Sequence, residues 1–171
     1  MALSLHDIQE IIRRKNWLSG QFIGASSTAR IIIIAEKPSL NFKKNPEKRS
    51  RGNFNSDSRA DKLFGKYVSK FLKGAYVTDM VKKEGLPGAD FVAEWNEESQ
   101  YKRILTAELR ATNPKVVGLM SRKVEKLFNK EFPEYRERSI YISQPAYIVR
   151  YNKRTRWDRQ FTQLRKLAGS L

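Results

Sequence analysis

The sequence predicts an α/β protein with a parallel central sheet, and three observations carry this prediction. The segment Ile31–Ile34 is an uninterrupted β-branched run, and a strand that is apolar on both faces is typical of a sheet covered by helices on both sides. Short apolar strands then alternate with segments of helical periodicity, which favours parallel pairing with right-handed crossovers. The length of 171 residues suits a single domain, which we expect to span residues 1–171.

The expected elements follow from the spacing of apolar residues. Recurrence every three or four residues predicts helices at about 4–16, 63–72, 104–109, 124–128 and 157–167. Apolar runs predict further strands at 75–78, 116–120 and 140–142, and polar or Pro- and Gly-containing stretches predict loops at 37–58, 84–96 and 143–155. Ser121 is the expected N-cap of the helix that carries Val124, and Trp157, at helical spacing with Phe161, is assigned to the core.

The charge of the chain indicates a polyanionic partner. Lys and Arg number 34 and Asp and Glu number 18, so the formal net charge is +16. Self-repulsion of this size destabilises a compact fold, whereas a nucleic-acid backbone gains from it through counterion release. We therefore expect a monomer that binds DNA, single- or double-stranded; a basic protein of a thermophile or of a ribosome-rich cell is the alternative. A membrane partner is not favoured, because the chain has no long apolar run and no strongly amphipathic basic helix with an aromatic face.

The residue types that are missing exclude several chemistries. The chain has no cysteine, which excludes disulfides, thiolate catalysis, zinc fingers and cysteine-held iron–sulfur clusters. Its single histidine, His6, cannot by itself supply a histidine metal site, so we expect no metal and no cofactor. The first fifteen residues mix acidic and basic side chains without an apolar signal core, which predicts a cytoplasmic, nucleoid-associated protein.

The topology predicts where a site should lie. Parallel sheets bind ligands beyond the carboxyl ends of their strands. The segments that follow Ile34, Val77 and Ile142 should therefore converge, and their polar residues become candidate site residues: Glu36, Lys37, Asp79 and Gln144.

Four segments, which include these three places, resemble the uracil-DNA glycosylase superfamily. Residues 31–39, IIIIAEKPS, resemble its first motif, where an apolar strand runs into a Gly-Glu-Ala-Pro-Gly or related turn. Residues 76–82, YVTDMVK, and 113–120, NPKVVGLM, resemble the Ile-Thr-Asn-Val-Val-Lys and Pro-Lys-Val strands of the thermophile-type (family 4) enzymes. Residues 143–150, SQPAYIVR, resemble the second motif, His-Pro-Ala or His-Pro-Ser followed by apolar residues and Arg. The ordered set covers about residues 28–166.

The resemblance implies a three-layer α/β/α sandwich around a central four-stranded parallel sheet, and hydrolysis of the base–sugar bond of a flipped nucleotide. The departures concern the site itself. Gln144 stands where the family has its catalytic histidine, Lys37 where some branches have a water-positioning Asp or Asn, and Asp79 where relatives read the uracil edge with Asn. Ala35 and Ser39 replace the Gly that opens the first motif and the Gly or Tyr that closes it, and the cluster cysteines are missing.

Each candidate catalytic residue has an alternative role. Glu36 could orient or deprotonate the attacking water and stabilise an oxocarbenium-like sugar, or form an ion pair with Lys37 or with the arginines near Arg49. Lys37 could clamp a phosphate or act as an amine nucleophile. Gln144 could donate a hydrogen bond to a base carbonyl but cannot carry positive charge.

The base is expected to be read by Asp79 and stacked on an aromatic ring. A carboxylate accepts a hydrogen bond from a cytosine amino group but repels O4 of uracil, which favours a modified cytosine and a role in phage defence. The alternative is that Asp79 caps the next turn or pairs with Lys82. Phe54 resembles the Phe in the loop after the first motif of family 4, and Phe42 is the second choice for stacking; either ring could instead pack the loop onto the domain.

Further residues are expected to contact DNA. Tyr147, Ile148 and Val149 form an apolar loop that could fill the gap left by a flipped base, unless Ile148 and Val149 form an edge strand. The turn and basic residues around the two motifs are expected to hold phosphates: Pro38, Ser39, Lys43, Lys44, Arg49, Arg51, Arg150, Lys153 and Arg154.

The leading interpretation is a DNA glycosylase with altered base specificity. A catalytically inactive nucleic-acid-binding module of the same fold is the alternative, favoured by the missing histidine of the second motif. A basic RNA-processing or ribosome-associated protein is the third class.

Overall fold

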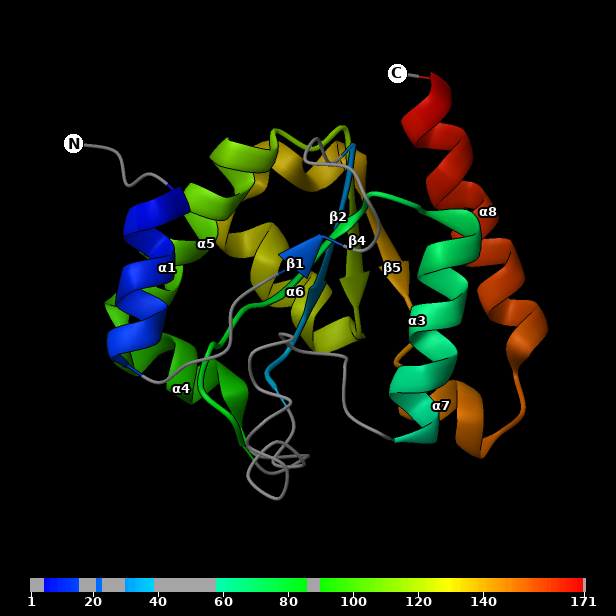
Figure 1. Ribbon diagram of the computed structural model, residues 1–171, viewed down its shortest axis with the longest axis horizontal. Helices are drawn as coiled ribbons and strands as arrows, with labels where there is room; N and C mark the ends of the chain where they lie inside the picture. The colour runs from blue at the N-terminus through cyan, green and yellow to red at the C-terminus, as the bar shows by residue number, and fades with distance from the viewer. Residues whose placement is uncertain (1–4, 16–20, 23–29, 39–57, 86–89, 171) are drawn as a thin grey trace.

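The computed structural model describes residues 5–15, 21–22, 30–38, 58–85 and 90–170 (Figure 1). Within these residues the chain forms one sheet of five strands in the order β1-β3-β2-β4-β5. The parallel strands are β2 (Ile31–Ala35), β3 (Tyr76–Asp79), β4 (Val116–Met120) and β5 (Ser139–Ile142). The two-residue strand β1 (Gln21–Phe22), which the sequence did not predict, pairs antiparallel with β3.

Helices cover both faces of this sheet, which gives the expected three-layer α/β/α sandwich (Figure 1). One face is covered by α3 (Arg59–Phe71), α7 (Pro145–Arg150) and α8 (Arg154–Ser170), and the other by α4 (Phe91–Glu97), α5 (Ser99–Thr112) and α6 (Arg122–Glu131). Helix α1 (Leu5–Arg14) packs on the outside of α5 through Ile8 and Ile12.

Strand β2 shows why its isoleucine run belongs in the middle of the sheet. Side chains alternate between the two faces of a strand. Ile31 and Ile33 therefore join the core under α3 and α8, whereas Ile32 and Ile34 join the core under α5 and α6. Trp157 is fully buried in the first of these cores, where its ring meets Phe64 edge-on at 5.9 Å, as expected for a core residue.

Two predicted loops contain helices. Helix α4 begins inside the predicted loop 84–96. Its seven residues follow a Gly- and Pro-containing stretch and are anchored by the buried side chains of Phe91 and Trp95. Helix α7 and the start of α8 lie inside 143–155, and α7 begins with a proline at its first position, which suits a helix start. A 3-10 helix, η2 (Pro133–Arg138), was also missed. None of the described helices is long and apolar enough to cross a membrane.

The parallel strands all run in one direction, so their carboxyl ends share one edge of the sheet, at the bottom of Figure 1. We call this the carboxyl edge and the opposite one the amino edge. Ala35 pairs with Asp79 across β2 and β3, and Met120 pairs with Ile142 across β4 and β5. The residues that follow these pairs are therefore brought together.

Candidate functional site

The centre of the carboxyl edge is the Glu36 side chain, which is half-buried. Its Oε1 accepts a hydrogen bond of 2.8 Å from Oγ of Ser121 and one of 2.9 Å from Nε2 of Gln144. The three residues follow β2, β4 and β5, so the ends of three neighbouring strands meet on one carboxylate oxygen.

This arrangement orients the carboxylate. Two donors on Oε1 fix the plane of the group, and within the described residues Oε2 of Glu36 has no hydrogen-bond partner. A carboxylate held in this way can accept a hydrogen bond from a water molecule at Oε2. The Gln144 amide, expected to donate to a base carbonyl, donates to Glu36 instead and so positions the carboxylate.

Ser121 has two roles, of which the sequence indicated only one. Its Oγ accepts from the backbone N–H of Val124 at 3.2 Å, which confirms the predicted N-cap of α6, and it also donates to Glu36. Its φ of 113° is a conformation that non-glycine residues rarely adopt and that clusters at functional sites. The strained backbone at Ser121 thus aims one hydroxyl at both the helix and the carboxylate.

The Ser121→Ala variant should be less stable by about 1 kcal/mol, the usual cost of a lost N-cap. Urea denaturation measures this loss. Ser58→Ala is the matched control, because Ser58 caps α3 by accepting from the Asp61 N–H at 3.0 Å without touching Glu36. Both variants should lose similar stability, but only Ser121→Ala should also impair the chemistry of Glu36. Equal activity in the two variants would contradict a positioning role for Ser121.

Asp79 lies beside Glu36 but below the surface. It ends β3, is only 2% exposed, and pairs in register with Ala35. The backbone N–H groups of Met80 and Val81 donate to the carbonyls of Ala35 and Glu36 at 2.9 and 3.0 Å. The end of β3 is therefore joined to the turn that carries Glu36, and Asp79 is buried beside that turn.

Lys37 points away from this centre. Its ammonium lies 2.7 Å from Oε1 of Glu94 on α4, and its side chain is only 6% exposed. The side chain also runs so close to Gly85 that a Cβ there would overlap it. Glu94, rather than Glu36, is thus the ion-pair partner of Lys37, and the geometry favours a structural role over a phosphate clamp or an amine nucleophile.

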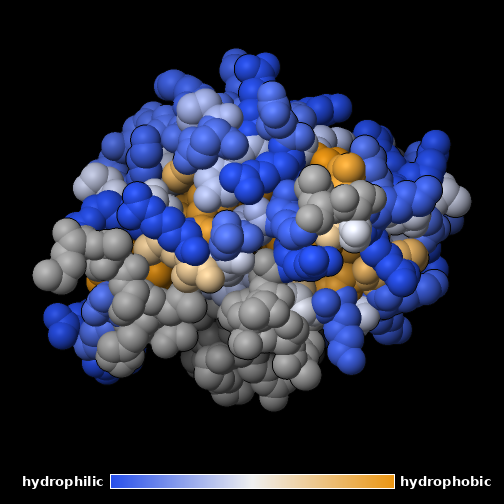
Figure 2. Space-filling model, turned by 90° about the horizontal axis from the view of Figure 1, so that it is seen from above, coloured by the Kyte–Doolittle hydropathy of each residue, from blue (hydrophilic) through white to orange (hydrophobic). Residues whose placement is uncertain are grey.

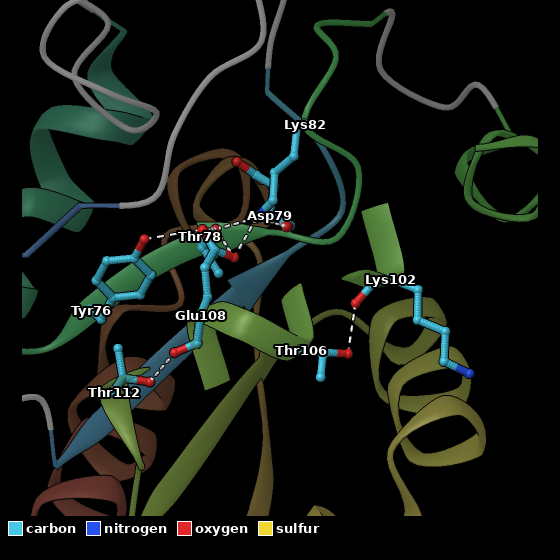
Figure 3. A network of polar contacts seen from close by, with 8 residues as sticks. All are labelled: Tyr76, Thr78, Asp79, Lys82, Lys102, Thr106, Glu108 and Thr112. Carbon is cyan, nitrogen blue, oxygen red and sulfur yellow. Dashed lines mark hydrogen bonds and ion pairs between the residues drawn. The ribbon is translucent and has the colours of Figure 1, made fainter. Parts of the chain in front are cut away.

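A buried polar network lies next to Asp79 (Figure 3). Lys82 and Glu108 are fully buried and form an ion pair of 2.6 Å, and Nζ of Lys82 also donates to Oγ1 of Thr78 and to the backbone carbonyl of Asp79. Lys82 thus contacts the main chain of Asp79, and its ion pair with Glu108 joins the segment after β3 to α5. The sequence did not indicate this, because Glu108 looks like one more polar residue of a helix.

The remaining donors of the network complete its hydrogen bonding. Oγ1 of Thr78 and the hydroxyl of Tyr76 each donate to Oε1 of Glu108 at 3.0 Å. Burial, together with the charge of Glu108, holds the pKa of Tyr76 well above its usual range, so its hydroxyl stays protonated and able to donate. The carboxylate is satisfied on both oxygens, which a buried charge requires.

The expected apolar wedge needs correction. Residues 147–149 lie in helix α7, so Ile148 and Val149 do not form an edge strand. Ile148 is fully buried in the core under α7, which removes it from contact with DNA. The exposed large hydrophobic side chains there are two tyrosines: Tyr147 is 38% and Tyr151 54% exposed, and their ring centroids lie 4.9 Å apart.

Two arginines lie near the rings of Tyr147 and Tyr141. The guanidinium of Arg156 lies 5.7 Å from the Tyr147 ring and 5.8 Å from that of Tyr141, over which Arg122 also lies at 4.0 Å. Exposed basic residues continue the surface, namely Arg150, Lys153 and Arg154. This group of tyrosines and arginines begins next to Ser121 and Gln144 in the chain, so it adjoins the site.

Other candidate residues lie outside the described residues: Ser39, Phe42, Lys43, Lys44, Arg49, Arg51 and Phe54. Pro38 is buried, and its carbonyl accepts from the Gly85 N–H at 3.1 Å. Among the residues that the structure describes, no three His, Asp or Glu side chains gather closely enough to hold a metal ion.

Comparison with known proteins adds no family. No model of a protein family matches the chain, and no curated protein is significantly similar to it. The observations that bear on the function of the chain are therefore the geometry of its carboxyl edge and its net charge of +16.

Proposed function

We propose that the protein is a DNA glycosylase that hydrolyses the N-glycosidic bond of a flipped, damaged or modified base. The observation that carries this proposal is the Glu36 carboxylate at the carboxyl edge, oriented on Oε1 by Ser121 and Gln144. A net charge of +16 supports a DNA substrate. Such a protein works in the cytoplasm at the nucleoid, as a monomer.

The chemistry follows from the orientation of Glu36. A water held by Oε2 attacks C1′ of the sugar, and the C1′–N bond breaks with its electron pair leaving on the base. Glu36 takes the proton of the water, and the departing base takes up a proton from solvent. The carboxylate charge also stabilises the oxocarbenium-like transition state. Because Gln144 carries no positive charge, it stabilises the departing base less than a protonated histidine would, so base release is slow.

Asp79 supports a modified cytosine as the base. Asp79 is buried and pairs in register with Ala35, the residue before Glu36. A carboxylate accepts a hydrogen bond from an exocyclic amino group and repels a carbonyl oxygen, so it favours a cytosine edge over a uracil edge. Modified cytosines occur in phage DNA, which makes defence against phage the biological role that fits.

The test is a release assay on oligonucleotides that carry uracil, cytosine or modified cytosines, with mass-spectrometric detection of the released base. The expected result is release of a modified cytosine and retention of uracil. Release of uracil alone would overturn the role of Asp79. Release of no base, with DNA binding intact, would favour the second candidate, an inactive nucleic-acid-binding module. The observation that favours this candidate is the neutral Gln144 in place of a histidine.

The exposed tyrosines should contribute to DNA binding. Stacking of a base on an aromatic ring contributes about 1–3 kcal/mol, so Tyr147→Ala with Tyr151→Ala should weaken binding by about tenfold or more. Fluorescence anisotropy with a labelled oligonucleotide measures the change. Leu167→Ala is the control, since Leu167 is 37% exposed on α8 but lies near the amino edge. Equal losses in the tyrosine and leucine variants would show that the rings do not contact DNA.

A further inference from the structure

The amino edge of the sheet, opposite Glu36, carries a hollow of about 620 Å³. It lies where β2 and β3 begin and where α3 and α8 end, at the top of Figure 1. Figure 2 views the molecule from this side and shows a mainly hydrophilic surface with small hydrophobic areas between. The volume is within the range of small-molecule sites, about 300–1,000 Å³.

The floor of the hollow is apolar and includes an aromatic ring. Ile31, Leu72 and Ala168 line it together with Phe71, which is half-buried. The Phe71 ring is stacked on Tyr67 with centroids 5.6 Å apart and meets Phe161 edge-on at 6.3 Å. These contacts hold the ring in place, and Nζ of Lys70 lies 5.0 Å from its centroid, so the ring lies where the apolar floor meets the cationic rim.

The rim of the hollow is cationic. Arg30, Lys70, Lys73 and Arg165 line it, all four are exposed, and none of the described lining residues is acidic. Lys70 lies in the last turn of α3, where a cation also suits the helix dipole. Arg30 and Lys73 lie outside the helices, so a helix dipole does not account for their positive charges. The Arg30 guanidinium is anchored by a hydrogen bond of 3.3 Å to the Ala168 carbonyl.

An apolar floor inside a ring of cations suits a ligand that has both an apolar part and a negative charge. We infer that the hollow binds a nucleotide, with the phosphate on the cationic rim and the base against Phe71. Arg and Lys are the common phosphate ligands of proteins, and a base stacks on an aromatic ring whatever its sequence. The nucleotide is either free or the phosphorylated end of a strand, and the site is separate from the carboxyl edge where Glu36 lies.

The test is a titration of the full chain with adenosine 5′-monophosphate, followed by amide NMR. Gly74 and Gly169 line the hollow, and their amide signals report directly on it. The expected result is a saturable shift of both signals with the nucleotide and a much weaker one with adenosine or with inorganic phosphate alone. If a 5′-phosphorylated oligonucleotide shifts the same signals, the natural ligand is the phosphorylated end of a strand. If the oligonucleotide shifts neither signal, the natural ligand is a free nucleotide.

The variants separate a site from general charge attraction. Lys70→Ala with Arg165→Ala removes one lysine of α3 and one arginine of α8 from the rim, and should weaken nucleotide binding by about tenfold or more. Lys66→Ala with Arg159→Ala removes the same charges from the same helices away from the hollow, and should change the affinity by less than about twofold.

Three outcomes would overturn the inference: equal losses in both double variants, equal affinity for phosphate and nucleotide, or shifts confined to the carboxyl edge. Tighter binding of decyl phosphate than of the nucleotide would overturn it as well, because the floor would then select alkyl chains. Base release measured on the same variants keeps the two proposals apart. Rim variants that lose nucleotide binding should keep full glycosylase activity. Glu36 variants that lose glycosylase activity should keep nucleotide binding.

Discussion

The Glu36→Gln variant is expected to release base about 10²- to 10⁴-fold more slowly than the parent protein, the usual contribution of a positioned acid–base group. Glutamine has nearly the same shape, so Ser121 and Gln144 can still contact the side chain. It cannot accept a proton from water, however, and it removes the charge that stabilises the developing cation. Single-turnover release from the preferred oligonucleotide measures the loss, and anisotropy should show DNA binding within about twofold of the parent protein.

Glu94→Gln is the control for this effect. Glu94 is also a partly exposed carboxylate, but it binds Lys37 on the side of α4 rather than facing the site. The same chemical change there should alter base release by less than about threefold. If Glu36→Gln retains full activity, or if Glu94→Gln loses as much activity, then the assignment of Glu36 as the general base that activates water is wrong.

The largest stability effect is expected at Lys82. Lys82→Met leaves the fully buried Glu108 carboxylate without its counter-ion, and removing one partner of such a pair costs about 3–5 kcal/mol. Adding Glu108→Gln should recover part of this loss, because a neutral amide still accepts from Tyr76 and Thr78 without burying an unpaired charge. Urea denaturation with linear extrapolation gives the free energies of unfolding.

Lys102→Met provides the matched comparison. Lys102 and Glu131 form an ion pair of 2.8 Å, but the Lys102 side chain is 52% exposed. Water already solvates this pair, so its loss should lower stability by less than about 1 kcal/mol. Similar losses of stability in Lys82→Met and Lys102→Met would mean that burial does not decide how much an ion pair contributes to the free energy of unfolding. A double variant as unstable as Lys82→Met alone would contradict the role of the unpaired charge.

Much of the carboxyl edge could be predicted because strand direction follows from local pattern. The run Ile31–Ile34 and the strand at 116–120 are apolar enough to be recognised alone, and parallel strands must end at a common edge. Glu36, Asp79 and Gln144 were therefore expected near one another, and the bond from Gln144 to Glu36 places two of them in contact. Short elements such as α7, with six residues, were missed because their pattern is too brief to recognise.

The sequence by itself determined the four parallel strands, the longer helices, the cap at Ser121 and the excess of positive charge, since each depends on neighbours in the chain or on composition. Only the tertiary structure decided which polar groups meet. Ser121 and Glu36 are 85 positions apart, and Lys82 and Glu108 are 26 apart. Such partners are selected by strand register and helix packing, which bring distant segments within hydrogen-bonding distance and remove them from water, and no local pattern encodes that distance.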